Sequence, residues 1–460
     1  PVYRTYLRET GGLSEEDERR IRTAVRLARR RNPLISASVF AFLEDVLLAR
    51  GDVPSDARPE LVRFALRFQQ ITGPVMAKAV EDTAFYRFNR LVSRNEVGGI
   101  PSKFSVSVEE FHAQNAERAR RWPLSMITTS THDTKRGEDA RARISVLSEV
   151  PDEWRRAVGR WTEIAKIVRT AVDGEPAPSR SLEYLFYQTV VGCWPPGWDG
   201  GEGRDELVRR LTDFLLKASK EGKEQTSWTN PNAPYDEAVR GFAAGMFASQ
   251  TFVDDMRRFV ETIASHGASN GLAQCLLRMT SPGVPDTYQG SELWDQTLVD
   301  PDNRKPIDFG RRRAMLARMN ERAHEPRALA KDLLETYADG AVKLHVLHQA
   351  LLARKAHPAL FLRGDYEPLP GGEHVIAFTR AFGQERLVCC VPRLTHVGTR
   401  GSLPWMLGEA WGDEALRVPH AGTYRNLMTG AKLEIAGEAR LAELFADFPV
   451  ALLIREERKA

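Results

Sequence analysis

The sequence predicts an α/β protein with a large helical region and an all-β terminal domain. Two runs of strand-favouring residues, 124–130 and 284–288, each lead into polar residues, and a long region of helical periodicity separates them. After Gly364 the pattern changes to short alternating runs between Gly and Pro turns, as in antiparallel β domains. The two runs, predicted to be buried parallel strands, suit part of a (β/α) barrel, although an irregular α/β fold would give the same pattern.

The N-terminal part is predicted to be helical from Leu13 to Leu48. Ser14 is placed to cap a first turn rich in acidic residues, and Ile21, Val25 and Ala28 recur at helical spacing. The many arginines between these apolar positions could bind an anionic ligand. We expect them instead to form a solvated helix face.

Further along, Gly73-Pro74 predicts the end of a helix that starts near Leu61, followed by a short strand over 75–80. Helices are expected from 137 to 277 and again up to 356. The predicted organisation has five parts: a helical insertion subdomain (1–60), a barrel segment with a catalytic strand end (61–136), a helical insertion (137–265), the last barrel strand with its helices (266–356) and a C-terminal antiparallel β domain (364–460).

Composition limits the classes of function. The chain has 460 residues, of which 42% are hydrophobic and 28% charged, which excludes disorder as the main state. A net charge of +3 gives no support for binding nucleic acid or an acidic membrane surface, and no apolar run approaches the length of a membrane helix. Four cysteines without CxxC spacing suggest neither zinc nor a disulfide framework, so a reduced, cytoplasmic location is expected. Because residue 1 is Pro, we expect a processed start or a chain that begins inside a longer protein.

The segment Ser130-Thr131-His132-Asp133-Thr134 is the strongest candidate site. A His and an Asp directly after a strand can project into a cleft and bind sugar hydroxyls, although Asp133 could also be an ordinary capping residue. No Gly-x-Ser-x-Gly, Walker or GxGxxG motif occurs, so neither serine nucleophile chemistry nor nucleotide binding is supported. We expect no cofactor and no metal.

Two other groups of residues have both a functional and a structural interpretation. The adjacent carboxylates Glu81-Asp82 and Glu138-Asp139 could act as acid and base, but such pairs are usually solvated or salt-bridged. Several aromatic residues could stack on sugar rings or serve as core residues. They are Tyr184, Phe186, Tyr187, Trp194, Trp198 and Trp228.

Four separated stretches together resemble a known family. They are 67–78 continuing through 81–87 to 95–99; 130–139; 187–189 with 194–195 and 226–231; and 285–290 with 300–304. At these positions the sequence resembles the maltooligosyl trehalose synthases, glucan mutases of the α-amylase superfamily. The resemblance runs in family order along the whole chain.

The resemblance implies the C-terminal part of an amylase-type (β/α)8 barrel with large helical insertions, followed by an all-β domain. It implies conversion of the reducing-end α-1,4 bond of a maltooligosaccharide into an α,α-1,1 bond, with retention of configuration. Asp133 matches the carboxylate that stabilises the transition state, and His132 matches a histidine that contacts sugar hydroxyls. Lys78, Glu81, Asp82 and Tyr86 are expected on the acceptor side.

The family's nucleophile and acid/base motifs are not found between Pro1 and Ala460. The expected partners are therefore a maltooligosaccharide and the N-terminal part of the same enzyme, and the chain alone is expected to be inactive. Two alternatives stay open: a non-catalytic, amylase-like glucan-binding protein, and an α-glucan hydrolase.

Overall fold

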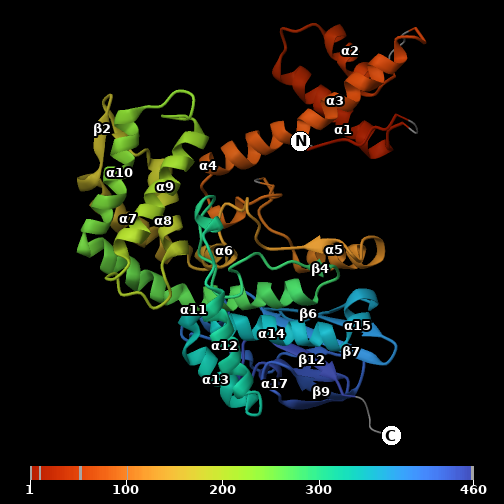
Figure 1. Cartoon of the computed structure of the whole chain (residues 1–460), viewed down its shortest axis with the longest axis vertical. Coiled ribbons are helices and arrows are strands. Elements are labelled where there is room, and N and C mark those ends of the chain that lie inside the picture. The colour runs from red at the N-terminus through yellow and green to blue at the C-terminus, as the bar shows by residue number, and fades with distance from the viewer. Residues whose placement is uncertain (1–2, 10–11, 51–53, 101, 457–460) are drawn as a thin grey trace. The chain divides into compact units, whose positions relative to one another are not determined.

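The computed structural model describes residues 3–9, 12–50, 54–100 and 102–456, which form two compact units. The first unit comprises Pro1–Arg87 with Glu221–Lys223, and the second comprises Phe88–Lys220 with Glu224–Ala460. The five-part division expected from the sequence stays a prediction, and each unit is described by itself (Figure 1).

The first unit is helical, as predicted. Helix α1 (Glu15–Arg31) begins where the sequence indicates, because the Ser14 hydroxyl accepts a hydrogen bond of 3.1 Å from the Asp17 amide. Helix α2 (Ala37–Leu47) packs on it through Ile21, Val25 and Phe40. The arginines of α1 are exposed, in agreement with the predicted solvated face.

The strand predicted over 75–80 is wrong, because the chain stays helical there. Helix α3 (Arg58–Met76) continues through Pro74 into a π-helical segment, η1 (Ala77–Ala84), and then α4 (Phe85–Arg87). Proline removes one amide donor from a helix. The Ala77 amide donates to the carbonyls of both Gly73 and Pro74, and the wider π turns that follow accommodate the defect.

The second unit begins with 3₁₀ turn η2 (Val92–Arg94) and contains a helical layer that includes most of the predicted insertion. Its helices are α5 (Val108–Arg121), α6 (Glu138–Ser145), α7 (Pro151–Val168), α8 (Arg180–Cys193), α9 (Arg204–Gly222), α10 (Ala233–Ala248) and α11 (Gln250–Thr280). A small hairpin of β2 (Thr170–Val172) and β3 (Glu175–Ala177) interrupts them. Aromatic packing holds the layer together, since the buried ring of Phe252 contacts the buried rings of both Trp161 and Phe186.

The two predicted parallel strands are neighbours, but they are short. Strand β1 (Met126–Ile127) pairs in parallel with β4 (Val284–Pro285), which confirms the predicted pairing. The expectation that these strands are buried is wrong, because Met126 is 73% and Val284 36% exposed. No third strand pairs with either of them in the described ranges, so the outer edge of each strand has no strand partner there.

After β4 the chain returns to helices and then to the β domain. The helices are α12 (Phe309–Glu321), α13 (Pro326–Glu335), α14 (Ala341–Ala356) and α15 (Pro358–Arg363). The antiparallel six-stranded sheet has the order β10-β9-β12-β7-β6-β5. Its strands are β5 (Glu367–Leu369), β6 (Val375–Phe382), β7 (Glu385–Pro392), β9 (Gly422–Asn426), β10 (Lys432–Ile435) and β12 (Ala451–Arg455). Two short strands, β8 (Ala415–Arg417) and β11 (Glu438–Arg440), form a separate pair, and the connections include short helices α16 (Thr395–Thr399) and α17 (Leu441–Leu444).

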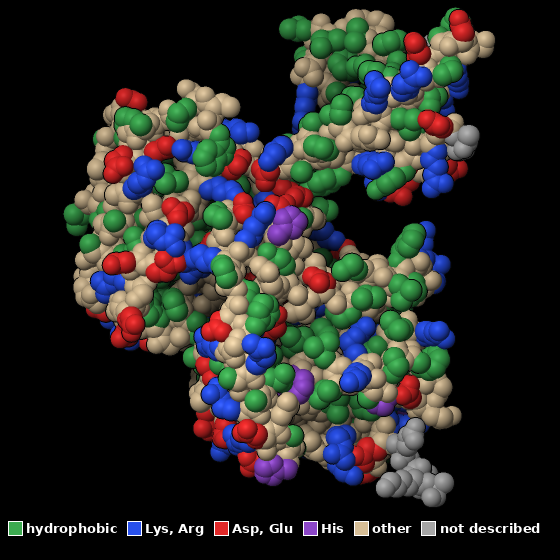
Figure 2. Space-filling model, in the orientation of Figure 1, with side chains coloured by type: hydrophobic (Ala, Val, Ile, Leu, Met, Phe, Trp, Pro, Cys, Tyr) green, Lys and Arg blue, Asp and Glu red, His purple; other side chains and the backbone are tan. Residues whose placement is uncertain are grey.

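Helix α11 joins the helical layer to the sheet (Figure 1). Its buried Leu272 and Leu276 belong to one core with Phe378 of β6 and Leu452 of β12. The face drawn in Figure 2 shows acidic and basic side chains interspersed, in keeping with the nearly balanced composition. Within the described ranges, no helix combines the length and apolar character needed to cross a membrane.

Candidate active site

His132 and Asp133 lie together on a tight turn that follows β1. The Thr134 hydroxyl donates to the Thr131 carbonyl at 2.9 Å, and the Asp133 amide donates to the Thr131 hydroxyl at 3.2 Å. Both His132 and Asp133 are exposed, whereas Thr134 and the residues that follow it are buried. The turn therefore exposes one imidazole and one carboxylate, where a ligand could reach them, while the residues that follow it are buried.

The base of the turn is held by Glu96. Its carboxylate accepts hydrogen bonds from the backbone amides of Lys135 at 2.7 Å and Arg136 at 3.2 Å. Glu96 is 9% exposed, so these charge-assisted bonds lie largely out of water. Among the residues that the structure describes, the cation found within 4 Å of the Asp133 carboxylate is the Lys135 ammonium, at 3.8 Å.

A second loop, 295–304, closes against the first along what we call the seam, residues 136–140 against 295–298. The Gly137 amide donates to the Thr297 carbonyl at 2.8 Å, and the Asp139 and Ala140 amides donate to the Asp295 carbonyl at 3.1 and 3.2 Å. Gly137 leaves no space for a side chain, because a Cβ there would lie 2.5 Å from the Asp295 carbonyl oxygen. The close approach of two backbones therefore requires glycine at this position.

The 3₁₀ turn η4 (Asp302–Arg304) of this second loop contacts the Asp133 turn directly. The Asn303 side-chain amide donates to the His132 carbonyl at 3.1 Å and to the Thr131 carbonyl at 3.4 Å. Asp302 in turn accepts two hydrogen bonds from Arg210 of α9, at 3.0 and 2.8 Å. Burial would raise the pKa of the Asp302 carboxyl, but the Arg210 guanidinium outweighs burial and the pKa is lowered.

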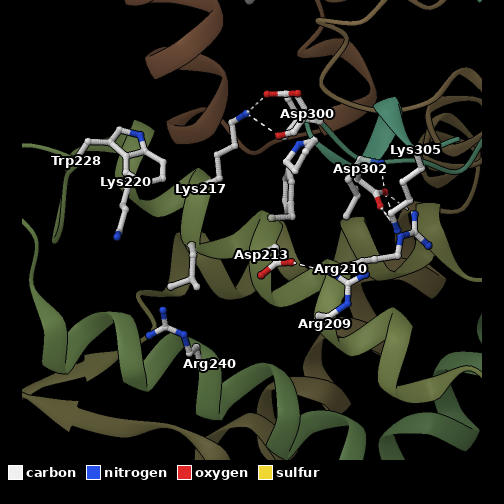
Figure 3. A pocket seen from close by; sticks show the side chains of 15 residues that line it. Arg209, Arg210, Asp213, Lys217, Lys220, Trp228, Arg240, Asp300, Asp302 and Lys305 are labelled. Atoms are coloured by element: carbon white, nitrogen blue, oxygen red, sulfur yellow. Dashed lines mark hydrogen bonds and ion pairs between the residues drawn. The ribbon is translucent and has the colours of Figure 1, made fainter.

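A cavity of about 500 Å³ opens between α9 and this loop (Figure 3). Several of its charged side chains pair with one another: the Lys217 ammonium lies 3.8 Å from the Asp300 carboxylate, and Lys305 lies 2.8 Å from Asp302. Trp228, 59% exposed, lies at one end. Paired charges and an aromatic ring suit an uncharged polar ligand better than an ion.

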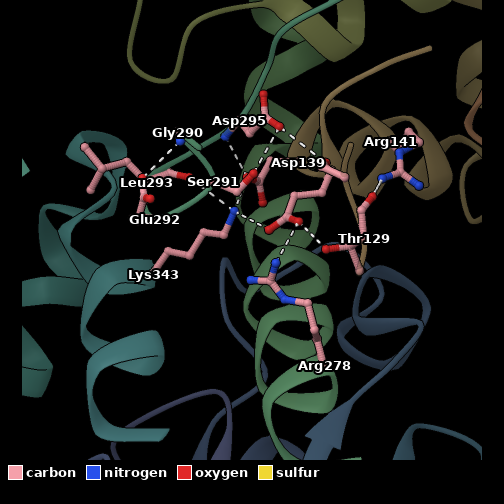
Figure 4. A network of polar contacts seen from close by, with 12 residues as sticks. Thr129, Asp139, Arg141, Arg278, Gly290, Ser291, Glu292, Leu293, Asp295 and Lys343 are labelled. Carbon is pink, nitrogen blue, oxygen red and sulfur yellow. Dashed lines mark hydrogen bonds and ion pairs between the residues drawn. The ribbon is translucent and has the colours of Figure 1, made fainter. Parts of the chain in front are cut away.

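Beneath the turn lies a buried network of charges that the sequence did not reveal (Figure 4). The Lys343 ammonium of α14 lies 2.5 Å from Asp139 and 2.7 Å from Glu138, and Arg278 of α11 lies 3.6 Å from Glu138. The Thr129 hydroxyl donates to Glu138. The adjacent carboxylates Glu138-Asp139 are thus salt-bridged, as one of the two interpretations expected.

The two carboxyl groups of this network differ in pKa. Burial raises the pKa of Asp139 to about 6, helped by the neighbouring Glu138 charge and opposed by Lys343. Burial also acts on Glu138, but Lys343 and Arg278 together lower its pKa to about 2. Burial alone would lower the pKa of Lys343, and the two carboxylates reverse that effect and raise it.

The four residues expected on the acceptor side belong to the first unit. Lys78 and Asp82 form an ion pair of 2.6 Å one helical turn apart, and Glu81 accepts a hydrogen bond of 2.6 Å from the Tyr3 hydroxyl. Burial and this contact raise the pKa of Tyr3 to about 12. Tyr86 is buried. Because Asp133 lies in the second unit, a shared site stays a prediction.

Sequence reasoning missed Glu96, Asn303 and Lys343. Lys343 could have been found, because it is a single cation in the first turns of an apolar helix, and a cation buried there needs an anionic partner. Asn303 lay inside a matched stretch, but nothing local shows that its amide reaches residue 132. Three of the six aromatic residues with two interpretations are core residues: Phe186, Tyr187 and Trp194 are buried, Tyr184 and Trp198 are partly buried, and Trp228 is exposed. No group of three or more His, Cys, Asp or Glu residues placed to hold a metal occurs in the part of the chain that the structure describes.

Comparisons with known proteins agree with the predicted family. A protein of Mycobacterium tuberculosis named as a maltooligosyl trehalose synthase is 38% identical over 96% of this chain. The predicted resemblance is confirmed. This chain spans 56% of that relative, so it matches part of a longer protein. It matches no protein-family model.

Solved structures of maltooligosyl trehalose synthases are also similar to this chain. The enzyme of Arthrobacter ramosus superposes with a TM-score of 0.79 at 36% identity, covering 99% of this chain and 52% of its own. A hypothetical maltooligosyl trehalose synthase of Sulfolobus tokodaii gives a TM-score of 0.67 at 26% identity, covering 96% and 56%. The architecture described above is therefore that of a corresponding part of these proteins.

Proposed function

We propose that this chain is the part of a maltooligosyl trehalose synthase that carries the transition-state carboxylate. The enzyme would convert the reducing-end α-1,4 bond of a maltooligosaccharide into an α,α-1,1 bond by intramolecular transfer. The observation that carries the proposal is the exposed Asp133, presented with His132 on a turn that Glu96 and Asn303 hold from two sides.

The proposed roles follow from the chemistry of the groups. Positive charge develops on the sugar ring in a retaining glycosyl transfer, and a fixed carboxylate stabilises it. Asp133 supplies that carboxylate, and the exposed His132 imidazole can hydrogen-bond a hydroxyl of the same sugar. The cavity beside η4 offers paired polar groups for further glucosyl units of an uncharged chain.

The transfer also needs a nucleophile, an acid/base and an acceptor site. We propose that the first two come from the N-terminal part of the enzyme and that Lys78, Glu81, Asp82 and Tyr86 contribute to the acceptor side. The outer edges of β1 and β4, which pair with no further strand in the described ranges, support such a partner, because strand edges in folded proteins are normally paired or covered. Met126, at 73% exposed, and Leu124, at 63%, are apolar side chains that further strands would cover.

The test is to incubate the purified chain with maltopentaose, with and without a separately expressed N-terminal part from a relative. We expect a non-reducing product only when both are present. A mixture that releases only glucose and shorter maltooligosaccharides would identify a hydrolase. Binding of maltopentaose without any product from the mixture would favour a glucan-binding protein.

A further inference from the structure

Asn303 makes the contact that reaches the candidate catalytic turn from the loop at 295–304. Its side chain is nearly buried, with the residue 6% exposed. The side-chain nitrogen donates to the His132 carbonyl at 3.1 Å and to the Thr131 carbonyl at 3.4 Å. These carbonyls belong to the two residues that immediately precede Asp133, so the contact acts on the backbone that carries the carboxylate.

The backbone of Asn303 is itself fixed. Its neighbour Asp302 accepts hydrogen bonds from Arg210 and, at 2.8 Å, from the Leu298 amide. On the other side, the Tyr288 hydroxyl donates to the Asn303 carbonyl at 3.1 Å. Helix α9 thus anchors η4, and η4 anchors the turn.

The chemistry of this contact requires a donor. An asparagine amide nitrogen carries two hydrogens, which is the number needed for two carbonyl acceptors. The Asn303 carbonyl oxygen Oδ1 is buried without a hydrogen-bond partner, so the donor half of this side chain makes its hydrogen bonds. An aspartate here would have the same shape but would turn oxygens toward both carbonyls, in a place too buried for water to screen the repulsion.

We propose that Asn303 is a positioning residue that sets the orientation of Asp133 by holding the peptide units of Thr131 and His132. This inference rests on the proposed function, in which Asp133 stabilises the transition state. The turn has other hydrogen bonds, from the Asp133 amide to the Thr131 hydroxyl at 3.2 Å, from the Thr134 hydroxyl to the Thr131 carbonyl at 2.9 Å, and from the amides after the turn to Glu96. None of these bonds reaches the His132 carbonyl, which Asn303 holds. Loss of the Asn303 donors therefore lets the turn rotate, and a carboxylate displaced by about 1 Å loses much of its effect on the transition state.

The first experiment measures hydrogen–deuterium exchange in the whole 460-residue chain, for the wild type and Asn303→Asp. We expect the amides of 131–134 to exchange about 10-fold faster in the variant, with exchange in α14 unchanged. Asn320→Asp adds the same charge at an exposed position on α12 and is the matched control, with exchange expected as in the wild type. If Asn303→Asp does not fold, Asn303→Ala removes the donors without adding charge and is read in the same way.

The second experiment measures turnover of maltopentaose by the chain combined with the N-terminal part. Asn303→Asp is expected to lower kcat roughly 10- to 100-fold while KM changes less than about 3-fold. In an Asp133→Asn background the same substitution is expected to cost less than about 2-fold, because both changes act through one carboxylate. If Asn303 had a merely structural role, Asn303→Asp would lower kcat by the same factor in the wild-type and the Asp133→Asn backgrounds.

Two results would overturn the inference: unchanged exchange at 131–134, or a full kcat loss from Asn303→Asp in the Asp133→Asn background. Failure of the proposed function looks different. In that case the wild-type mixture makes no non-reducing product, while the exchange experiment still decides whether Asn303 holds the turn.

Discussion

Asp133 and Asp139 lie close in sequence but in opposite environments. The Asp133 side chain is 53% exposed, and its nearest cation among the described residues, Lys135, is 3.8 Å away. The Asp139 side chain is 5% exposed and lies 2.5 Å from the Lys343 ammonium. One short segment therefore carries one carboxylate that is exposed and another that is buried and ion-paired inside the protein.

The difference teaches how to separate a functional carboxylate from a structural one. Perturbed pKa values often mark active sites. Here Asp139, with a pKa raised to about 6 by burial, belongs to the supporting network and not to the exposed turn. Accessibility and the backbone that holds the turn are what make Asp133 the candidate.

The largest expected effect on stability comes from Lys343→Met. Removal of the ammonium leaves Glu138 and Asp139 buried together without their shared ion-pair partner, and Arg278 stays 3.6 Å from Glu138, so the free energy of unfolding should fall by about 3–5 kcal/mol. Urea denaturation of the chain measures this change. A loss below about 1 kcal/mol would show that protonation or water neutralises the carboxylates and that the network is not structural.

Asp133→Asn should have the opposite effect: a large loss of turnover with little change in stability. In the combined enzyme, turnover should fall roughly 10²- to 10³-fold, equivalent to about 3–4 kcal/mol, with substrate binding changed far less. The free energy of unfolding of the chain should stay within about 0.5 kcal/mol of the wild type, because the side chain is exposed. Near-normal turnover would show that the His132-Asp133 pair is an ordinary turn and that Asp133 has no catalytic role.

Two histidines extend the comparison to pH. His132 is exposed, while His266 of α11 is 2% exposed, its Nδ1 lies 3.0 Å from the Thr395 hydroxyl, and burial lowers its pKa to about 4. His266 binds a proton near pH 6.5 in the unfolded chain but only near pH 4 in the folded chain. The free energy of unfolding therefore falls as the pH drops through this window.

The contribution of His266 alone to the loss in free energy of unfolding between pH 7 and pH 5 is expected to be about 2 kcal/mol. Urea denaturation at the two pH values measures it. His266→Asn should remove this contribution, and the part that buried His345 makes in the same direction should stay. An equal pH dependence in the wild type and His266→Asn would assign the effect to other groups.

The smallest expected effect is that of Lys166→Met, the surface counterpart of Lys343→Met. Lys166 pairs with Glu163 at 2.7 Å on α7, but the two side chains are 53% and 69% exposed. Water and salt screen such pairs, so the free energy of unfolding should change by less than about 0.5 kcal/mol. A loss comparable with that of Lys343→Met would mean that burial does not govern the strength of these ion pairs.

Features encoded by neighbouring residues were predictable. The Ser14 cap, the β7 strand and the position of His132 and Asp133 after a strand all follow from patterns within a few residues. The strand expected over 75–80 failed because Pro74 indicates a break more often than the π-helical continuation found here.

Features that depend on distant partners were not predictable. Lys343 meets Glu138 across 205 positions, and Asn303 meets His132 across 171. No periodicity links such pairs, and the identity of a residue does not show which carbonyl or carboxylate it will reach. The sequence thus predicted the exposed turn but not the residues that hold it.

The seam between 136–140 and 295–298 has a consequence for how the protein reaches this structure. Its backbone bonds join segments separated by more than a hundred residues, and the helical layer lies between them in the sequence. Contacts of such long range form late, because closing a long loop costs conformational entropy before the new contacts contribute any stabilisation. During synthesis the ribosome must release residues up to about 304 before the Asp133 turn can be fixed, so a nascent chain stopped in the helical layer should fold its helices and still lack an ordered candidate site.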